Sequence, residues 1–189
     1  YFNTTKDNRL TDEIAEAVLR TALHYGLVVM EEPQDYTARA QIMWAGSLSH
    51  NGLTGAGADS DWATHQLEHE LSGLFDVAHG AGLAALWGSW ARYVYKEDVS
   101  RFVQFAVNVM GIYNDYDRPE ETALAGIEAL EAFFVLLDMP VSLSDMGIVV
   151  TDEQIREMAY KCSFQDRRTI GGFKVLGRSD MEAIYRAAK

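Results

Sequence analysis

Three of the five histidines fall within one short segment, Asp61 to Gly80, which reads DWATHQLEHELSGLFDVAHG. His65 and His69 are four residues apart, so on a helix they share one face, about 6 Å apart along the axis. His79 follows an expected turn at 76–78, which can fold it back towards His65. Neutral imidazoles suit Zn²⁺ and Fe²⁺, although a divalent site normally has three or four ligands. Two histidines from adjoining helices would therefore supply part of a metal site, completed by other residues.

The histidine spacing alone is a weak indication of metal, because any surface helix can carry it. Two stronger metal patterns are excluded. Gly73 stands where a zinc-protease helix would place its second histidine after His69, and no glutamate stands three residues before any histidine, as carboxylate-bridged di-iron bundles require. His24 and His50 stand alone, and we interpret them as ordinary core or surface residues.

Length and composition predict one globular domain over residues 1–189, since the chain is 48% hydrophobic and can bury a good core. The net charge of −12 argues against nucleic acid and anionic membrane surfaces as partners. The most apolar stretch, 71–86, is interrupted by Asp76 and His79, so no segment is expected to span a bilayer. The single cysteine, Cys162, forms no internal disulfide and is expected to be a buried thiol, and with no leader segment recognisable we expect a cytoplasmic protein.

Hydrophobic periodicity predicts an all-α fold. Thr11 is a candidate cap for the first helix and Gly26 its expected end, while Thr151 and Gln154 form a candidate capping box. Only 147–150 and 174–176 look extended, and both are too short to build a sheet. The expected helices cover about 11–26, 35–53, 61–75, 79–95, 97–110, 119–137, 151–163 and a short segment from Ser179.

Beyond periodicity, the run from Ala63 to Gly80 resembles the histidine signature of the iron-containing (group III) alcohol dehydrogenases. Their pattern, His-x3-His-x9-His-Gly, is met at 65, 69, 79 and 80. Four further segments resemble the NAD(P)H-dependent butanol dehydrogenase branch: ARAQIMW at 38–44, NGL at 51–53, DWATH at 61–65 and IGGFK at 170–174. Glu68, in place of a small residue, and Ala78, in place of a frequent proline, depart from the pattern without removing a ligand.

The resemblance implies a multi-helix bundle similar to the C-terminal metal-binding domain of that family, a dehydroquinate synthase-like α domain. The N-terminal α/β coenzyme-binding domain would be absent from this chain. Family members hold a divalent ion, Fe²⁺ or Zn²⁺, with one Asp and three His, and the resemblance makes His65 and His79 two of these ligands. The other two would lie upstream of Tyr1. His69 corresponds to a non-ligand histidine near the nicotinamide and substrate, which implies proton relay or substrate positioning.

The implied activity is hydride transfer between NAD(P)H and a primary alcohol or aldehyde, with the metal as Lewis acid. Trp62 and Thr169 are candidate pocket residues, and the intact enzyme is expected to be a homodimer, with the isolated chain inactive. Two alternatives stay open: a glycerol or polyol dehydrogenase on the same plan, and a non-catalytic helical interaction module. The second would show no metal dependence.

Overall fold

The computed structural model describes all residues, 1–189, and is built from α-helices without a β-strand. The only extended pairing is an isolated antiparallel bridge between Ile170 and Leu176. None of its helices combines the length and the apolar character needed to cross a membrane. The all-α prediction is therefore confirmed. The helices are α1 Arg9–Glu31, α2 Tyr36–His50, α3 Ala63–Phe75, α4 His79–Val94, α5 Val99–Asn108, α6 Pro119–Leu136, α7 Asp152–Cys162 and α8 Arg178–Ala187, with 3-10 turns η1 Leu53–Gly55 and η2 Tyr95–Glu97.

The chain divides into two compact units, each made of two separate segments. Unit 1 comprises 1–60 and 98–137, and unit 2 comprises 61–97 and 138–189. The expectation that 1–189 acts as one domain stays a prediction.

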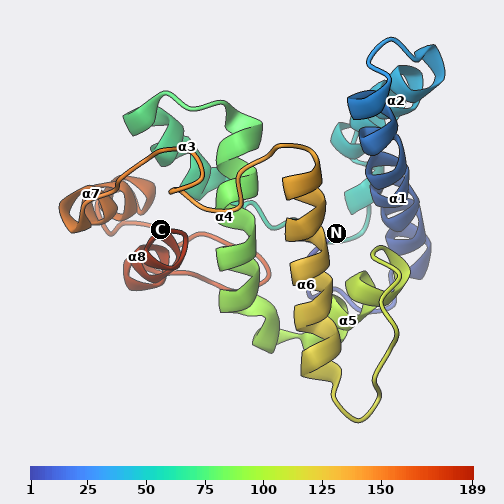
Figure 1. Ribbon diagram of the computed structural model, residues 1–189. Coiled ribbons are helices and arrows are strands. Elements are labelled where there is room, and N and C mark those ends of the chain that lie inside the picture. Colours follow the sequence, from blue (N-terminus) through green and yellow to red (C-terminus); the bar gives the residue numbers. More distant parts are fainter. The chain divides into compact units, whose positions relative to one another are not determined.

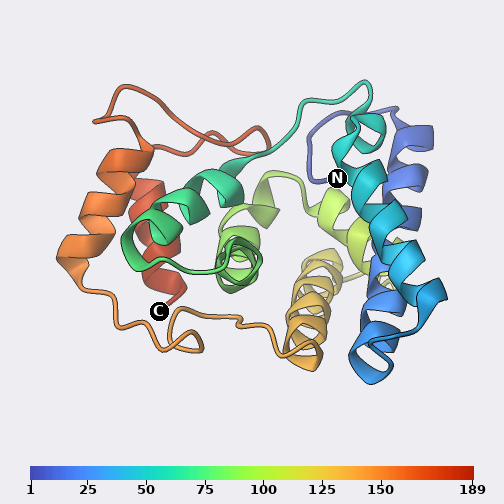
Figure 2. The same ribbon diagram turned by 90° about the horizontal axis from the view of Figure 1, so that it is seen from above.

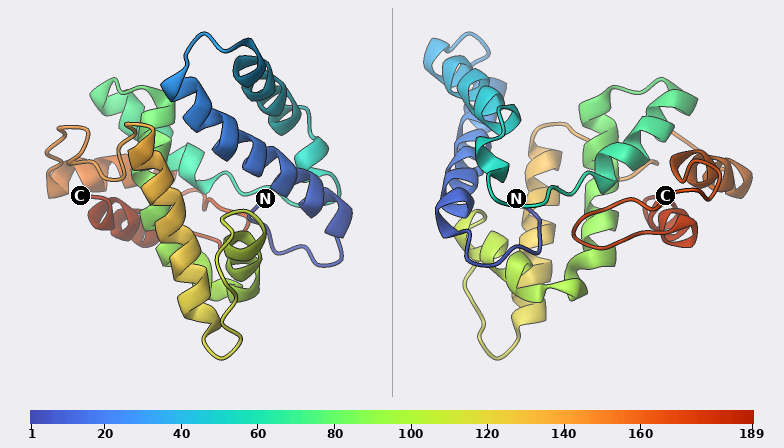
Figure 3. Two further views of the ribbon diagram at one scale, coloured as in Figure 1. Left: turned by 45° about the vertical axis from the view of Figure 1, so that its right-hand side comes forward. Right: turned by 180° about the vertical axis from the view of Figure 1, so that it is seen from behind.

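Unit 1 contains two helix pairs, α1 with α2 and α5 with α6 (blue, and yellow-green with gold, in Figures 1 and 3). Phe102, Phe105 and Ile127 are fully or almost fully buried at its core. Gly126 of α6 lies so close to α5 that an added Cβ would be 2.5 Å from the Cβ of Ala106. The two helices thus approach closely because position 126 has no side chain.

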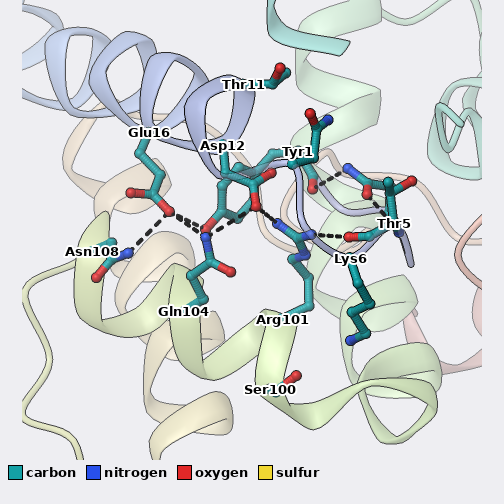
Figure 4. A network of polar contacts seen from close by, with 12 residues as sticks. Tyr1, Thr5, Lys6, Thr11, Asp12, Glu16, Ser100, Arg101, Gln104 and Asn108 are labelled. Carbon is teal, nitrogen blue, oxygen red and sulfur yellow. Dashed lines mark hydrogen bonds and ion pairs between the residues drawn. The ribbon is translucent and has the colours of Figure 1, made fainter. Parts of the chain in front are cut away.

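A buried ion pair connects α1 to α5 within unit 1 (Figure 4). The guanidinium of Arg101 donates to the Asp12 carboxylate at 2.6 Å and to the carbonyl of Thr5 at 2.9 Å. Gln104 donates to Glu16 at 2.8 Å, and so does the hydroxyl of Tyr1. Burial, followed by the hydrogen bond to Glu16, raises the pKa of Tyr1. These contacts satisfy charged groups that would be costly to bury alone. The participating residues of the cluster are Tyr1, Thr5, Asp12, Glu16, Arg101, Gln104 and Asn108.

Unit 2 is organised around α3, which packs on both α4 and α7, while α8 packs on α4 and α7. Figure 2 shows α7 and α8 (orange and red) side by side. The phenol of Tyr185 is completely buried and donates to the carbonyl of Leu67 at 2.6 Å, which connects α8 to α3. The other large buried side chains of this unit are Leu71, Leu86, Leu143, Ile155, Met158, Leu176 and Met181.

The first helix differs from the prediction at both ends. It begins at Arg9, and the Thr11 hydroxyl donates to the carbonyl of Ala56 at 3.0 Å instead of capping the helix. It also continues through Gly26 to Glu31, so the predicted end was wrong. An added Cβ at Gly26 would lie 3.3 Å from the Phe133 ring, so this glycine permits close helix packing and does not terminate the helix.

Most other boundaries fall within a few residues of the prediction. The second helix ends at His50, short of Leu53, because the chain turns at Gly52, whose φ is +88°. The capping box is present, with Thr151 and Gln154 each accepting from the other's backbone N–H. Segment 147–150 forms no strand.

Candidate metal centre

The start of α3 is fixed by Asp61, through both oxygens of its carboxylate. One oxygen accepts from the backbone N–H of Ala63 at 2.8 Å. The other accepts from the N–H groups of Gly172 and Phe173, each at 2.8 Å. Two segments far apart in sequence, DWATH at 61–65 and IGGFK at 170–174, are thereby joined at the end of the helix that carries His65.

The turn between α3 and α4 brings His79 back towards α3. Helix α3 ends at Phe75, and Asp76 adopts the left-handed conformation with a φ of +52°, which Asp tolerates better than most residues. The Ser72 hydroxyl lies 3.2 Å from the carbonyl of Val77 and supports the same turn. As a result α4 begins at His79 directly beside the α3 histidines.

The three histidines of the segment lie together, as their spacing predicts. His65 Nδ1 is 3.2 Å from His79 Nε2. The rings of His69 and His79 are stacked, with centroids 5.5 Å apart and planes 29° apart. The side chain of His79 is 49% exposed, so the cluster is open to solutes.

The separation of His65 and His79 suits two ligands of one ion. Two nitrogens that each lie about 2.0–2.1 Å from a tetrahedral Zn²⁺ are about 3.3–3.4 Å apart. The 3.2 Å between His65 Nδ1 and His79 Nε2 is close to that value. Two imidazoles do not complete a coordination shell, so further ligands would have to join them.

Glu68 is a fourth member of the cluster, and its part in the site was missed in the sequence. It is fully buried, and its carboxylate accepts from His79 Nδ1 and from the Ser72 hydroxyl. One ligand atom each from Glu68, His69 and His79 lies within 4.8 Å of the other two. Its spacing of four residues from Ser72 places both on one helical face, but sequence alone could not place that face against His79.

The two predicted pocket residues occupy different surroundings. Trp62 is 52% exposed, and its ring centroid lies 4.9 Å from that of His65. Thr169 is exposed and lines a hollow of about 620 Å³ that includes none of the three histidines. The pocket role of Thr169 stays a prediction. The other residues that line this hollow are Ser163, Asp166, Arg167, Arg168, Gly177 and Arg178.

Two ionisable groups of unit 2, Glu70 on α3 and Cys162 on α7, have shifted pKa values. Burial raises the pKa of Glu70, and the positive charges of Lys161 and Arg168 partly oppose this shift. Burial also raises the pKa of the Cys162 thiol to about 11, and its sulfur lies 3.4 Å from the carbonyl of Gln66. The expectation of a buried thiol is confirmed. His24 and His50, the two histidines outside the segment, are exposed.

Comparison with known proteins places this geometry in context. Residues 1–189 match the profile of the Fe-containing alcohol dehydrogenase family, C-terminal. The chain is 40% identical over 191 residues to the NADH-dependent butanol dehydrogenase B of Clostridium acetobutylicum, a match that covers 98% of this chain and 47% of that protein. The aldehyde reductase YqhD of Escherichia coli has a similar structure, with a TM-score of 0.92, 30% identity, and coverage of 100% of this chain and 49% of that one.

A second solved structure, the NADH-dependent butanol dehydrogenase A of Thermotoga maritima, matches with a TM-score of 0.89 and 33% identity, over 100% of this chain and 48% of that one. The chain thus spans about half the length of the relatives that it matches.

Proposed function

The chain belongs to the Fe-containing alcohol dehydrogenase family, as its C-terminal part, and from this premise we propose that the full-length protein interconverts primary alcohols and aldehydes with NAD(P)H and a divalent metal. The observation that carries the proposal is the approach of His65 Nδ1 to His79 Nε2 at 3.2 Å, beside an exposed third histidine. The names of the relatives, butanol dehydrogenases and an aldehyde reductase, support this substrate class.

In this proposal His65 and His79 hold Fe²⁺ or Zn²⁺ together with ligands from outside the chain. When bound, the divalent cation supplies Lewis-acid polarisation of the aldehyde carbonyl. The imidazole of His69 is exposed and stacked on His79, so it can reach a substrate at the same site. When bound, NAD(P)H would supply the hydride for the carbonyl carbon. His69 would give a proton to the carbonyl oxygen during reduction and would take it back in the reverse reaction.

The surrounding residues have supporting roles in the proposal. Trp62 lies beside His65, where its exposed ring would exclude water from a bound substrate. Thr169 would line the substrate pocket if the segment that carries it borders the bound substrate. The N-terminal domain would bind most of the NAD(P)H, and we propose a cytoplasmic homodimer as the working form.

The experiment is an assay of the full-length protein with matched metal analysis. Bound metal is measured by elemental analysis, and oxidation of NADH and of NADPH with butyraldehyde is followed before and after chelation. Turnover that is lost on chelation and restored by Fe²⁺ or Zn²⁺ supports the proposal. Stoichiometric metal with turnover of glycerol but not of butyraldehyde would favour a polyol dehydrogenase. A protein that binds no metal would contradict the proposal and favour an interaction module.

A further inference from the structure

We propose that Glu68 is a positioning residue of the metal centre, which holds His79 in the tautomer that directs the Nε2 lone pair towards His65. This inference rests on the proposed function, because it assigns the orientation of one of the two proposed ligands. The two side chains that it connects come from different helices, α3 for Glu68 and α4 for His79.

The donor and acceptor roles follow from the chemistry of the carboxylate. An ionised carboxylate can only accept hydrogen bonds, so His79 Nδ1, which is bonded to Glu68, must carry the proton. A neutral imidazole has one proton, so His79 Nε2 keeps its lone pair. That nitrogen is the one that lies 3.2 Å from His65 Nδ1. The hydrogen bond therefore leaves a lone pair on the nitrogen that a shared cation would require.

The surroundings of Glu68 hold its carboxylate in one place. It is 0% exposed, and the Ser72 hydroxyl, one turn further along α3, also donates to it. Gly82 of α4 lies against it, and an added Cβ there would be 2.6 Å from Glu68 Oε1 and 2.8 Å from its Cγ. Helix α4 thus presents His79 to the carboxylate and, one turn later, leaves the space that the carboxylate occupies.

A different arrangement would make Glu68 itself a ligand, together with His69 and His79. Against this, a cation between Glu68 and His79 would have to break the hydrogen bond between these two side chains. It would also have to fit beside a carboxylate that Ser72 and Gly82 already enclose. The exposed Nε2 side of His79 offers the cation open space, since this side chain is half exposed. The geometry thus favours Glu68 as a second layer behind the ligand, in the carboxylate–histidine–metal order.

The test uses the full-length protein with Zn²⁺ and two substitutions of similar size. Glu68→Leu removes the acceptor, while Glu68→Gln keeps an acceptor oxygen without the charge. Glu70→Gln is the matched control, because Glu70 is an acid on the same helix whose charge interacts with those of Lys161 and Arg168. Zinc affinity is measured by competition with a chelator. The His79 tautomer is read from the ¹⁵N shifts of the ring in metal-free protein, a property that a general loss of stability would not change.

We expect Glu68→Leu to weaken zinc binding about 10–100-fold, the usual effect of losing such a partner. It should also convert His79 from a single Nδ1–H form to a mixture of tautomers. Glu68→Gln should lose affinity by a smaller factor, and Glu70→Gln should match the unsubstituted protein in both measurements. Should Glu68→Leu unfold, the ¹⁵N shifts of unsubstituted protein and Glu68→Gln still decide, because positioning requires Nδ1–H in both.

Two results would overturn the assignment. If His79 is in the Nε2–H form in the unsubstituted protein, Glu68 does not set the tautomer. The same conclusion follows if Glu68→Leu leaves the tautomer of His79 unchanged. Loss of zinc in Glu68→Gln as complete as in His79→Ala would make Glu68 a ligand. Failure of the proposed function would look different, because the unsubstituted protein would then bind no zinc. The tautomer of His79 in the metal-free protein would still decide the role of Glu68.

Discussion

The imidazole of His79 is engaged through both ring nitrogens, with Glu68 at Nδ1 and His65 at Nε2. His69 contacts His79 in a different way, by stacking on its ring. The three histidines are therefore not equivalent, although sequence spacing alone does not distinguish His65 from His69. In the proposed function His65 and His79 are the metal ligands, and His69 exchanges the proton with the substrate.

This difference predicts opposite outcomes for two alanine substitutions in the full-length enzyme. His65→Ala should lower metal affinity by more than the roughly 100-fold that marks the loss of a supporting residue. His69→Ala should keep the metal and lower turnover by about 10²–10⁴-fold, the usual contribution of a general acid or base. Elemental analysis after dialysis and steady-state rates with butyraldehyde measure both. The exposed His50 provides the control, as His50→Ala should change neither. Metal-free His69→Ala protein would contradict the assignment.

The Cys162 thiol should be unreactive in the folded chain. With its pKa raised by burial to about 11, the thiolate is about one molecule in a thousand at pH 8, and the sulfur is fully buried. Reaction with a disulfide reagent such as DTNB should be slow in buffer and rapid in denaturant, with Cys162→Ala as the background. Rapid reaction in buffer would contradict the buried position.

The same shift gives a stability effect of known sign. The thiol ionises near 9.0 in the unfolded chain and near 11 in the folded one, so between these values the folded state binds more protons. Its contribution to stability is therefore complete below about pH 9 and is lost as pH rises, by up to about 1.4 kcal/mol per pH unit. Urea unfolding at pH 8 and pH 10 should show a smaller loss in Cys162→Ala than in the unsubstituted chain.

At the scale of elements, glycines that look alike in the sequence have different roles. Gly26 was predicted to end a helix, but it lies inside α1 and packs near Phe133. Gly126 permits α5 and α6 to approach, whereas an added Cβ at Gly46 in α2 would meet no atom within 4 Å. Periodicity and capping residues predicted which segments are helical. The packing partners of each glycine depend on segments distant in sequence, so they could not be predicted.

Alanine should therefore have opposite effects at two helical glycines of unit 1. Gly126→Ala places a Cβ 2.5 Å from that of Ala106 and should destabilise by about 1–3 kcal/mol through overpacking. Gly46→Ala meets open space and should stabilise by about 0.5–1 kcal/mol through helix propensity. Urea unfolding followed by circular dichroism measures both. Equal effects at the two positions would show that α5 and α6 can separate without cost.

The ion pair between α1 and α5 should be among the larger side-chain contributions to unit 1. Arg101→Met leaves the carboxylate of Asp12 buried without its cation, and breaking such a pair costs about 3–5 kcal/mol. The control is Arg118→Met, whose side chain is 63% exposed in its pairs with Asp115 and Glu121, and it should leave the unfolding midpoint unchanged. A similar small effect for Arg101→Met would mean that water replaces the lost donor.

At the scale of the whole molecule, the candidate site lies within unit 2. Asp61 to Glu97 contributes His65, His69 and His79, and the segment 138–189 contributes the loop that Asp61 holds. The sequence could place the three histidines in one cluster because a short turn joins their helices. It could not show that Asp61 fastens residues 172 and 173, because that contact spans more than 110 residues. Thr169 lines a hollow that includes none of the three histidines, so its predicted pocket role stays a prediction.

The isolated chain, 1–189, should show no aldehyde reductase activity. It spans about half the length of its relatives, and the proposed metal centre has only His65 and His79 from this chain, two ligands short of a full shell. In the proposed function an N-terminal domain binds most of the NAD(P)H, so the isolated chain would lack a site that holds the nicotinamide near His69. NADH and NADPH oxidation with butyraldehyde should therefore stay at background even with excess Zn²⁺ or Fe²⁺, while the full-length protein turns over under the same conditions. Circular dichroism verifies that the isolated chain is helical, so that inactivity reflects the missing parts and not unfolding. Turnover by the isolated chain would mean that unit 2 alone binds both coenzyme and metal, and would place the whole reaction within these 189 residues.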